Sequence, residues 1–181
     1  MKTYIALLRG INVSGHNIIN MDALKGALGD LNFSAIRTYI QSGNILFETD
    51  RTDTNHLAKM IGETILEHFG CSVPVIIRNQ PELEFISKNN PFLRGRLENT
   101  ENLYVSFLTE TPEDTKVKKI MEIKFLPDEF IISGNEIYLF CPDGYGRTKL
   151  SNQFFENKLK TTATTRNWKT ILKLKQLMEI P

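Results

Sequence analysis

The hydrophobic positions of the first half of the chain predict strands and helices in a fixed order. The apolar run from Thr3 to Leu8 predicts a first strand, and Met21 to Leu31 carries apolar residues at helical spacing, with Asn20 as a cap. The remaining predicted elements of this half are strands over 36–41, 45–49 and 73–78, and a helix over 57–69 that Gly70 ends. The resulting order, β-α-β-β-α-β, is typical of the ferredoxin-like fold.

The same order is predicted again in the second half. Its predicted strands cover 103–109, 129–132, 136–141 and 161–164, and its predicted helices cover 112–123 and 151–160. The segment from Thr111 to Asp114 indicates the start of the first of these helices, with Thr111 as the cap and a proline at the first position. A last amphipathic helix after Trp168 lies outside the repeated order.

The two central hairpins share the tripeptide Ser-Gly-Asn, at 42–44 and at 133–135. This repeat favours an internal duplication, although Ser-Gly-Asn suits any tight hairpin because Gly and Asn tolerate positive φ. We therefore predict an α+β protein of two tandem ferredoxin-like (βαββαβ) domains with an extra C-terminal helix. The predicted boundaries are 1–79 for the first domain, 80–101 for a helical connection and 102–181 for the second domain.

Composition and charge exclude several classes of protein. The chain has 181 residues, 41% of them hydrophobic, and a formal net charge of +1, which is ordinary for a globular protein and excludes a collagen-like or disordered chain. The two cysteines and three histidines fit no metal-binding or redox spacing, and no apolar run approaches the roughly 18 residues of a membrane span. We expect a cytoplasmic protein with no metal, no cofactor and no membrane association.

The first strand-to-helix loop, over 9–19, is longer than usual for such a connection. Gly10 and Gly15 have the spacing of the first part of a phosphate-binding P-loop. The Lys-Ser/Thr pair that should follow is replaced by His16-Asn17. Because the phosphate-binding lysine and the magnesium-binding hydroxyl are both missing, the loop is not a nucleotide-hydrolysing P-loop.

A looser anion site remains open for this loop. Arg9 offers a planar fork of donors, and Asn12 and Asn17 offer neutral donors. The alternative is a structural loop that buries Ile11 and Val13 and uses Arg9 in a salt bridge.

A second candidate loop, over 143–151, also joins a strand to a helix. Two glycines flank Tyr145, which we expect to be exposed, and Arg147 and Lys149 place positive charge at the helix start. That placement is unfavourable unless an anion lies nearby, and the segment 143–181 carries a net charge of +5. The alternative is a solvated turn with two surface cations.

The third candidate is the segment around Arg166. Arg166 can complete an anion site, Asn167 can cap the last helix, and Trp168 can anchor that helix in the core rather than act as a stacking platform.

Four motifs in the expected order resemble a bacterial family, the domain of unknown function 1697 family. They are Tyr4–Val13, Thr38–Asn44, Gly144–Arg147 and Ala163–Trp168. Ser14 and Asn32 stand where the family usually or often has glycine. The resemblance implies a pair of ferredoxin-like domains in a cytoplasmic bacterial protein and carries no established activity.

Our leading hypothesis is that the chain binds a phosphorylated ligand, a nucleotide or a nucleic acid, at polar loops beside strand ends. The predicted ligand-binding residues are Arg9, Asn12, Asn17, Gln41, Asn44, Tyr145, Lys149, Arg166 and Asn167. The second hypothesis is an enzyme acting on a phosphorylated small molecule, with Tyr145 or Lys149 transferring a proton. The third is a structural or regulatory subunit in which Arg9 and Arg166 pair with carboxylates, and no motif identifies its protein partner.

Overall fold

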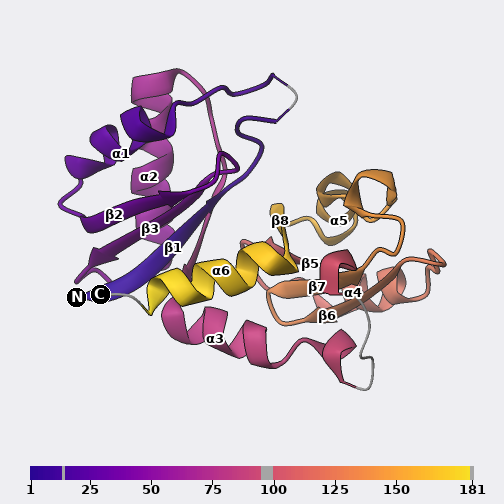
Figure 1. The fold of residues 1–181 in the computed structure, drawn as a ribbon. Helices are drawn as coiled ribbons and strands as arrows, with labels where there is room; N and C mark the ends of the chain where they lie inside the picture. Colours follow the sequence, from indigo (N-terminus) through magenta and orange to yellow (C-terminus); the bar gives the residue numbers. More distant parts are fainter. Residues whose placement is uncertain (14, 95–99, 180–181) are drawn as a thin grey trace. The chain divides into compact units, whose positions relative to one another are not determined.

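A computed structural model of the chain describes residues 1–13, 15–94 and 100–179 (Figure 1). Two compact units are present, one formed by Met1–Glu84 with Leu174–Pro181 and the other by Phe85–Lys173. Each contains a four-stranded antiparallel sheet with helices, so the predicted α+β class with two tandem ferredoxin-like domains and a C-terminal helix is confirmed. The predicted domain boundaries are a separate matter and stay a prediction. Ser14 and part of the predicted helical connection lie outside the described residues.

The first unit follows the predicted order of elements. They are β1 (Lys2–Leu8), α1 (Met21–Gly29), β2 (Ser34–Tyr39), β3 (Asn44–Thr49), α2 (Thr54–Phe69) and β4 (Val75–Asn79), followed by α3 (Gln80–Lys88), which continues past Glu84. The sheet order is β2-β3-β1-β4. The predicted caps are confirmed: the Asn20 side chain accepts hydrogen bonds from two backbone amides, and Gly70 ends α2 in the left-handed conformation, with φ 69°.

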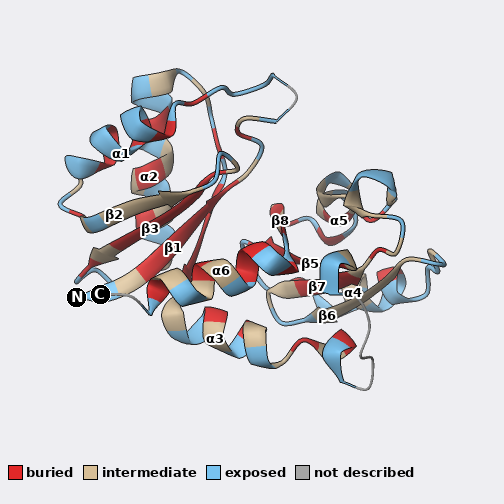
Figure 2. Ribbon diagram, viewed as in Figure 1, coloured by how far each residue is buried: buried red, intermediate tan, exposed pale blue. Residues whose placement is uncertain are grey.

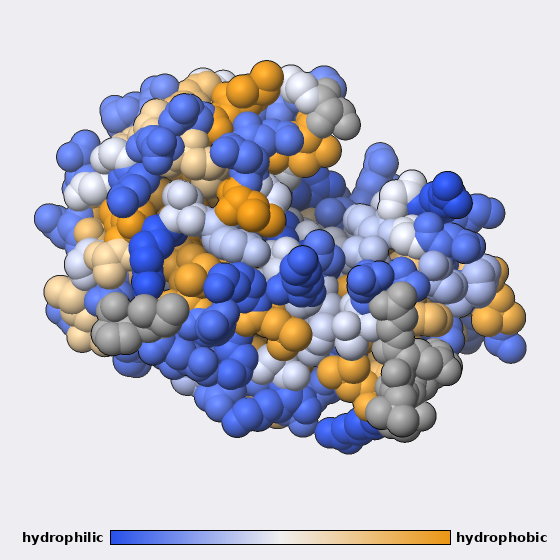
Figure 3. Space-filling view, in the orientation of Figure 1, coloured by the Kyte–Doolittle hydropathy of each residue, from blue (hydrophilic) through white to orange (hydrophobic). Residues whose placement is uncertain are grey.

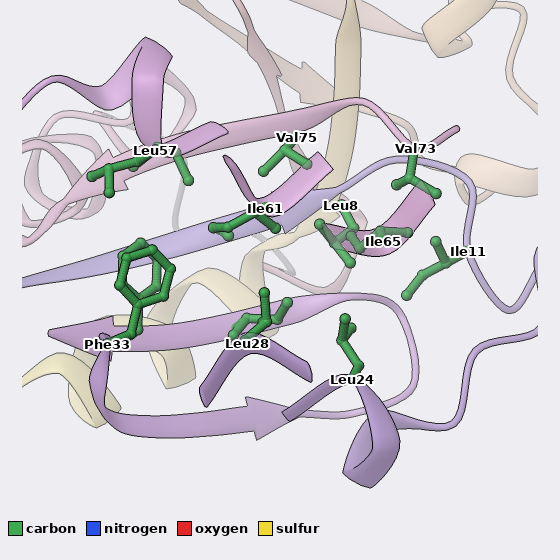
Figure 4. Packing of buried hydrophobic residues seen from close by; sticks show 14 of the residues in the cluster. Leu8, Ile11, Leu24, Leu28, Phe33, Leu57, Ile61, Ile65, Val73 and Val75 are labelled. Atoms are coloured by element: carbon green, nitrogen blue, oxygen red, sulfur yellow. The ribbon is translucent and has the colours of Figure 1, made fainter. Parts of the chain in front are cut away.

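The core of the first unit lies between its sheet and two helices. Leu24 and Leu28 of α1 and Ile61 and Ile65 of α2 pack with β1, β3 and β4 in one cluster (Figure 4). Alternate residues of β1, such as Leu7, are also fully buried, as expected for a sheet that is covered on both faces. Figure 2 shows β1 buried along most of its length while the outer sides of α1 and α2 are exposed.

The second unit repeats this arrangement. Its elements are the 3₁₀ turns η1 (Pro91–Leu93) and η2 (Thr100–Asn102), β5 (Leu103–Leu108), α4 (Asp114–Met121), β6 (Glu129–Ser133), β7 (Glu136–Phe140), η3 (Tyr145–Arg147), α5 (Asn152–Leu159), β8 (Ala163–Asn167) and α6 (Trp168–Met178), whose last residues are grouped with the first unit. The sheet order is β6-β7-β5-β8. Ile120 of α4 and Phe155 of α5 pack on one face of this sheet.

Two predicted boundaries in the second unit are wrong. The helix α4 begins at Asp114, and its N-cap is Glu113 rather than Thr111. The hydroxyl of Thr111 instead donates a hydrogen bond to the side chain of Asn135, so it is not available to the helix. The strand β8 covers 163–167 rather than 161–164, because the hydroxyl of Thr161 bonds to that of Thr109 (2.9 Å) and the sheet pairing continues to Asn167.

The shared tripeptide does not occupy equivalent positions in the two hairpins. In the first unit the amide of Leu8 donates to the carbonyl of Gly43 (2.8 Å), and in the second the amide of Leu108 donates to the carbonyl of Asn135 (2.8 Å). The tripeptides are therefore one residue out of register. The first hairpin turns around residues 40–43, whereas the second turns around residues 134 and 135 alone.

Two Arg-Asn dipeptides, one in each unit, do occupy equivalent positions in the sheets. Arg78-Asn79 ends β4 and pairs with Ile5 and Tyr4, while Arg166-Asn167 ends β8 and pairs with Val105 and Tyr104. In both units the asparagine side chain accepts a hydrogen bond from an amide of the helix that follows. Internal duplication stays a prediction, and these dipeptides support it better than the hairpin tripeptide does.

The face shown in Figure 3 is mostly hydrophilic, with apolar surface in small patches. Across residues 1–13, 15–94 and 100–179, no helix has both the length and the apolar character needed to cross a bilayer.

Candidate functional site

The loop between β1 and α1 uses its asparagine amides to hold its own backbone. The Oδ1 atom of Asn12 accepts from the amide of Ile19 (2.8 Å), and its Nδ2 atom donates to the carbonyls of Ile19 (3.0 Å) and Gln41 (2.9 Å). Nδ2 of Asn17 donates to the carbonyl of Gly10 (3.0 Å). Both asparagines have positive φ, at 53° and 46°. The Asn12 amide therefore ties the loop to the hairpin between β2 and β3.

The hairpin side of this contact is equally constrained. Nδ2 of the buried Asn44 donates to the carbonyl of Tyr39 (3.0 Å) and to the hydroxyl of Ser42 (3.1 Å). Gly43 has a φ of 74°, and a Cβ atom placed there would lie 2.7 Å from Cβ of Leu8. No side chain fits at this position, so the hairpin passes directly against β1.

The first unit thus brings together several predicted site residues. Asn12 and Gln41 are in direct contact, while the side chain of Gln41 is exposed and that of Arg9 is half-buried. The alternative interpretation of the loop is half right: Ile11 is buried, but Val13 is exposed. The bonds of Asn12 and Asn44 are structural bonds within the unit, and ligand binding by these residues stays a prediction.

Tyr145 of the second unit is not the exposed side chain that the sequence predicts. It is half-buried, its ring packs on that of Tyr104 (centroids 5.2 Å apart), and its hydroxyl lies 2.9 Å from the hydroxyl of Thr165. The Thr165 hydroxyl also donates to Oδ1 of Asn152 (2.6 Å) and lies 2.6 Å from Oγ of Ser106. This network of hydroxyl groups fixes η3 to β5, β8 and α5.

The segment around Arg166 is largely buried. The guanidinium donates to the hydroxyl of Thr164 (2.9 Å) and to the carbonyl of Thr165 (2.9 Å), and burial lowers the pKa of Arg166 to about 10. The predicted cap is confirmed, because Oδ1 of Asn167 accepts from the amide of Thr170 (2.8 Å). The predicted core position of Trp168 is also confirmed.

A cavity of about 640 Å³ lies within the second unit, between the loop that follows α4 and the loop that follows β7. We call it the anion cavity. It is lined by Lys124, Phe125, Leu126, Pro127, Asp128, Asp143, Arg147 and Lys149. Three cationic side chains and two carboxylates thus line one opening, and all three cations are exposed. Lys149 is the one member of this lining among the predicted ligand-binding residues.

A hydrogen bond between side chains holds the two loops of the anion cavity together. The hydroxyl of Thr148 donates to Oδ2 of Asp128 (2.5 Å) and accepts from the amide of Leu150 (3.0 Å). Cys141 lies buried beside this bond. Burial raises the pKa of its thiol, a hydrogen bond with Thr148 offsets part of the rise, and the resulting pKa is about 11. A thiol with that pKa stays protonated near neutral pH and is a poor nucleophile.

Metal binding has no obvious set of ligands in the part of the chain that the structure describes. Within it, no three His, Cys, Asp or Glu side chains lie close enough to hold one ion. Asp128 and Asp143 are the two carboxylates that line the anion cavity.

A family model described as "Protein of unknown function (DUF1697)" matches residues 1–138 of the chain. The chain belongs to this family. The resemblance found in the sequence is therefore confirmed, although the motifs at 144–147 and 163–168 lie beyond the match. The family description names no activity, so it assigns no role to the anion cavity.

A solved structure shows the same fold. It is described as the structure of conserved bacterial protein SP0830 from Streptococcus pneumoniae, and it is 24% identical to this family member. The alignment covers 98% of this chain and 99% of the other, with a TM-score of 0.77. A comparison with curated proteins found no match.

Sequence reasoning missed most of the anion cavity. Lys124 and Asp128 belong to no recognisable motif, and they lie in the connection between α4 and β6, about 20 residues before the loop that they face. Arg147 belongs to a noted motif but was not among the predicted ligand-binding residues. In the connection between α4 and β6, Pro127 is a local signal, because it marks a turn between a helix and a strand.

Proposed function

We propose that this protein binds a phosphorylated ligand, a nucleotide or a nucleic acid, in the anion cavity of its second unit. The observation that carries the proposal is the convergence of Lys124, Arg147 and Lys149 on one opening. Arginine presents a planar fork that matches phosphate oxygens, and lysine adds a compact positive charge. A volume of about 640 Å³ is within the usual range of small-molecule sites.

The two carboxylates of the lining refine the proposal. Asp128 accepts a hydrogen bond from Thr148, and Asp143 lies in the same loop as the two cations Arg147 and Lys149. A carboxylate repels a bare phosphate but accepts hydrogen bonds from hydroxyl or amino groups. The lining therefore suits a ligand that joins a phosphate to hydrogen-bond donors, as a sugar phosphate or nucleotide does.

The proposal uses a smaller set of residues than the sequence predicts. Lys149 keeps its predicted role, with Lys124 and Arg147 added. Tyr145 fixes the loop that carries Arg147 and Lys149 through its hydrogen bond with Thr165, and Asn167 caps α6. Ligand binding by Arg9, Asn12, Asn17, Gln41, Asn44 and Arg166 stays a separate prediction.

The test measures binding by calorimetry at low salt. Ribose 5-phosphate, inorganic pyrophosphate and adenosine monophosphate are titrated into the wild type and into Lys124→Ala, Arg147→Ala and Lys149→Ala. Each substitution is expected to weaken binding by about tenfold or more, because a hydrogen bond to a charged group contributes about 1.5–3 kcal/mol. Lys118→Ala is the matched control, because Lys118 is an exposed lysine of α4 that does not line the cavity.

The outcome can contradict the proposal in two ways. Absence of binding by all three compounds to the wild type would remove it. Equal losses of affinity in Lys118→Ala and the three cavity variants would show that general surface charge, not the cavity, attracts the anion.

The predicted enzyme role has one supporting observation, which is that Lys149 lines the anion cavity beside Asp143. The hydroxyl of Tyr145, the other predicted proton-transfer group, is held by Thr165. We test this second function by incubating the protein with a bound phosphate ester and following its ³¹P spectrum. Turnover that Lys149→Arg abolishes, with binding retained, would support an enzyme, and an unchanged spectrum would favour binding alone.

A further inference from the structure

A second, more apolar cavity of about 270 Å³ adjoins the anion cavity. We call it the apolar cavity. Its lining residues are Met121, Ile123, Lys124, Phe125, Leu126, Asp128, Glu129 and Phe130. The two cavities share Lys124, Phe125, Leu126 and Asp128, so one wall serves both. A ligand in the anion cavity can therefore contact side chains that also line the apolar cavity.

The shared wall is held in place by aromatic packing. The ring of Phe125 meets those of Phe154 and Phe130 edge to face, with centroids 5.0 and 6.3 Å away. These contacts tie the connection after α4 to α5 and β6. A side chain fixed in this way presents a preformed apolar surface, and a ligand need not order it on binding.

Apolar side chains at the apolar cavity are unusually exposed. Leu126 is 78% exposed and Met121 is 49% exposed. Exposed apolar groups beside a cavity are typical of ligand-binding sites, where the ligand covers them. The volume of about 270 Å³ is below the usual range for a whole ligand, so it suits one part of a ligand whose remainder lies in the anion cavity.

We infer that the ligand is a nucleotide whose phosphate binds Arg147 and Lys149 and whose base lies in the apolar cavity against Phe125 and Leu126. This inference rests on the proposed function. A base is favoured over an acyl chain because the carboxylates of Asp128 and Glu129 also line the apolar cavity. Carboxylate oxygens accept hydrogen bonds from the exocyclic amino groups of adenine, guanine and cytosine, and an acyl chain offers them no donor.

The test compares four ligands on the full-length protein by calorimetry. They are ribose 5-phosphate, adenosine monophosphate, uridine monophosphate and octyl phosphate. We expect adenosine monophosphate to bind at least tenfold tighter than ribose 5-phosphate. We expect uridine monophosphate to bind more weakly than adenosine monophosphate, since uracil has no exocyclic amino group.

Substitution at the apolar cavity makes the test specific. Met121→Ser is expected to weaken the binding of adenosine monophosphate by about five- to tenfold while leaving that of ribose 5-phosphate unchanged, because Met121 lines the apolar cavity and not the anion cavity. Leu66→Ser is the matched control, because Leu66 is a half-exposed leucine of α2 outside both cavities, and it should change neither affinity.

Four results would overturn the inference. Equal binding of ribose 5-phosphate and adenosine monophosphate would show that the base is not recognised, although the proposed function would stand. Octyl phosphate binding as tightly as adenosine monophosphate would show that an apolar chain occupies the apolar cavity. Single-stranded oligonucleotides of increasing length are titrated in addition, and an affinity that rises with their length would show a polymer ligand. If none of the four ligands binds, the proposed function fails together with the inference.

Discussion

Two long loops join a strand to a helix in this protein, and they use their polar residues in opposite ways. The loop over 9–20 in the first unit places the amides of Asn12 and Asn17 in hydrogen bonds with its own backbone and the neighbouring hairpin. The loop over 141–151 in the second unit alternates anchors with cavity-lining cations: Tyr145 and Thr148 bond inward, while Arg147 and Lys149 line the anion cavity. Loop length and polarity are therefore poor guides to function until the partner of each donor is known.

The hairpins beside β1 and β5 give the largest expected difference between the units. Gly43→Ala should lower the free energy of unfolding by about 2–4 kcal/mol, because φ is 74° and the new Cβ would lie within 2.9 Å of atoms of Leu8 and Ile11. Gly134→Ala should lower the free energy of unfolding by only about 1 kcal/mol. Its φ is 59°, but the new Cβ would have no atom within 4 Å beyond its neighbours in the chain. Urea unfolding followed by circular dichroism measures both. Similar losses would show that φ alone, not the contact with β1, limits these positions.

Among the side chains of the first loop, the amide of Asn12 should contribute most to stability. Asn12→Gly keeps a residue that tolerates positive φ and removes the side-chain hydrogen bonds to Ile19 and Gln41, so we expect a loss of about 1–3 kcal/mol. Asn17→Gly removes one exposed hydrogen bond and should cost about 0.5 kcal/mol. Thermal unfolding of the two variants compares them directly. A larger loss for Asn17→Gly would reverse the assignment.

A buried phenol should make the second unit sensitive to alkali. Burial, with a smaller contribution from the charge of Glu136, raises the pKa of Tyr138 from 10 to about 12. The folded state then holds the proton more tightly than the unfolded state does, so stability is complete below pH 10 and falls as pH rises from 10 to 12. By pH 11 the loss is about 1 kcal/mol. Tyr138→Phe should lack this part of the decline when urea unfolding is compared at pH 8 and pH 11. An identical decline in the variant would show that Tyr138 does not cause it.

The smallest expected effect on stability concerns the cavity cations. Arg147→Gln and Lys149→Gln should change the free energy of unfolding by no more than about 0.5 kcal/mol, because both side chains are exposed. Urea unfolding at pH 7 measures the change. A loss above about 1 kcal/mol in either variant would mean that these cations hold the loop, as Asn12 does in the first unit.

The fold was predictable because its signals are local. Apolar spacing locates the strands and helices, and the Asn20, Gly70 and Asn167 caps act within a few residues along the chain. The prediction failed at Thr111, where a side chain with a helix-capping pattern bonds to Asn135 instead. The matching Ser-Gly-Asn tripeptides were misleading for a similar reason, since register is set by the lengths of the turns.

The candidate site was predictable only in part because it depends on distant pairs. Lys149 was recognised from its own loop, but Lys124 reaches the anion cavity from the connection after α4. Tyr145 is drawn inward by Thr165, a partner 20 residues away. A single sequence contains no mark of either pairing, whereas a structure shows both directly.

The path of the chain has a consequence for the order in which the protein is made. The first unit consists of Met1–Glu84 and Leu174–Pro181, and the whole of the second unit lies between them in the sequence. Because translation runs from the amino end, the ribosome delivers every residue of the second unit before the last segment of the first. The unit that begins synthesis first is therefore the one completed last.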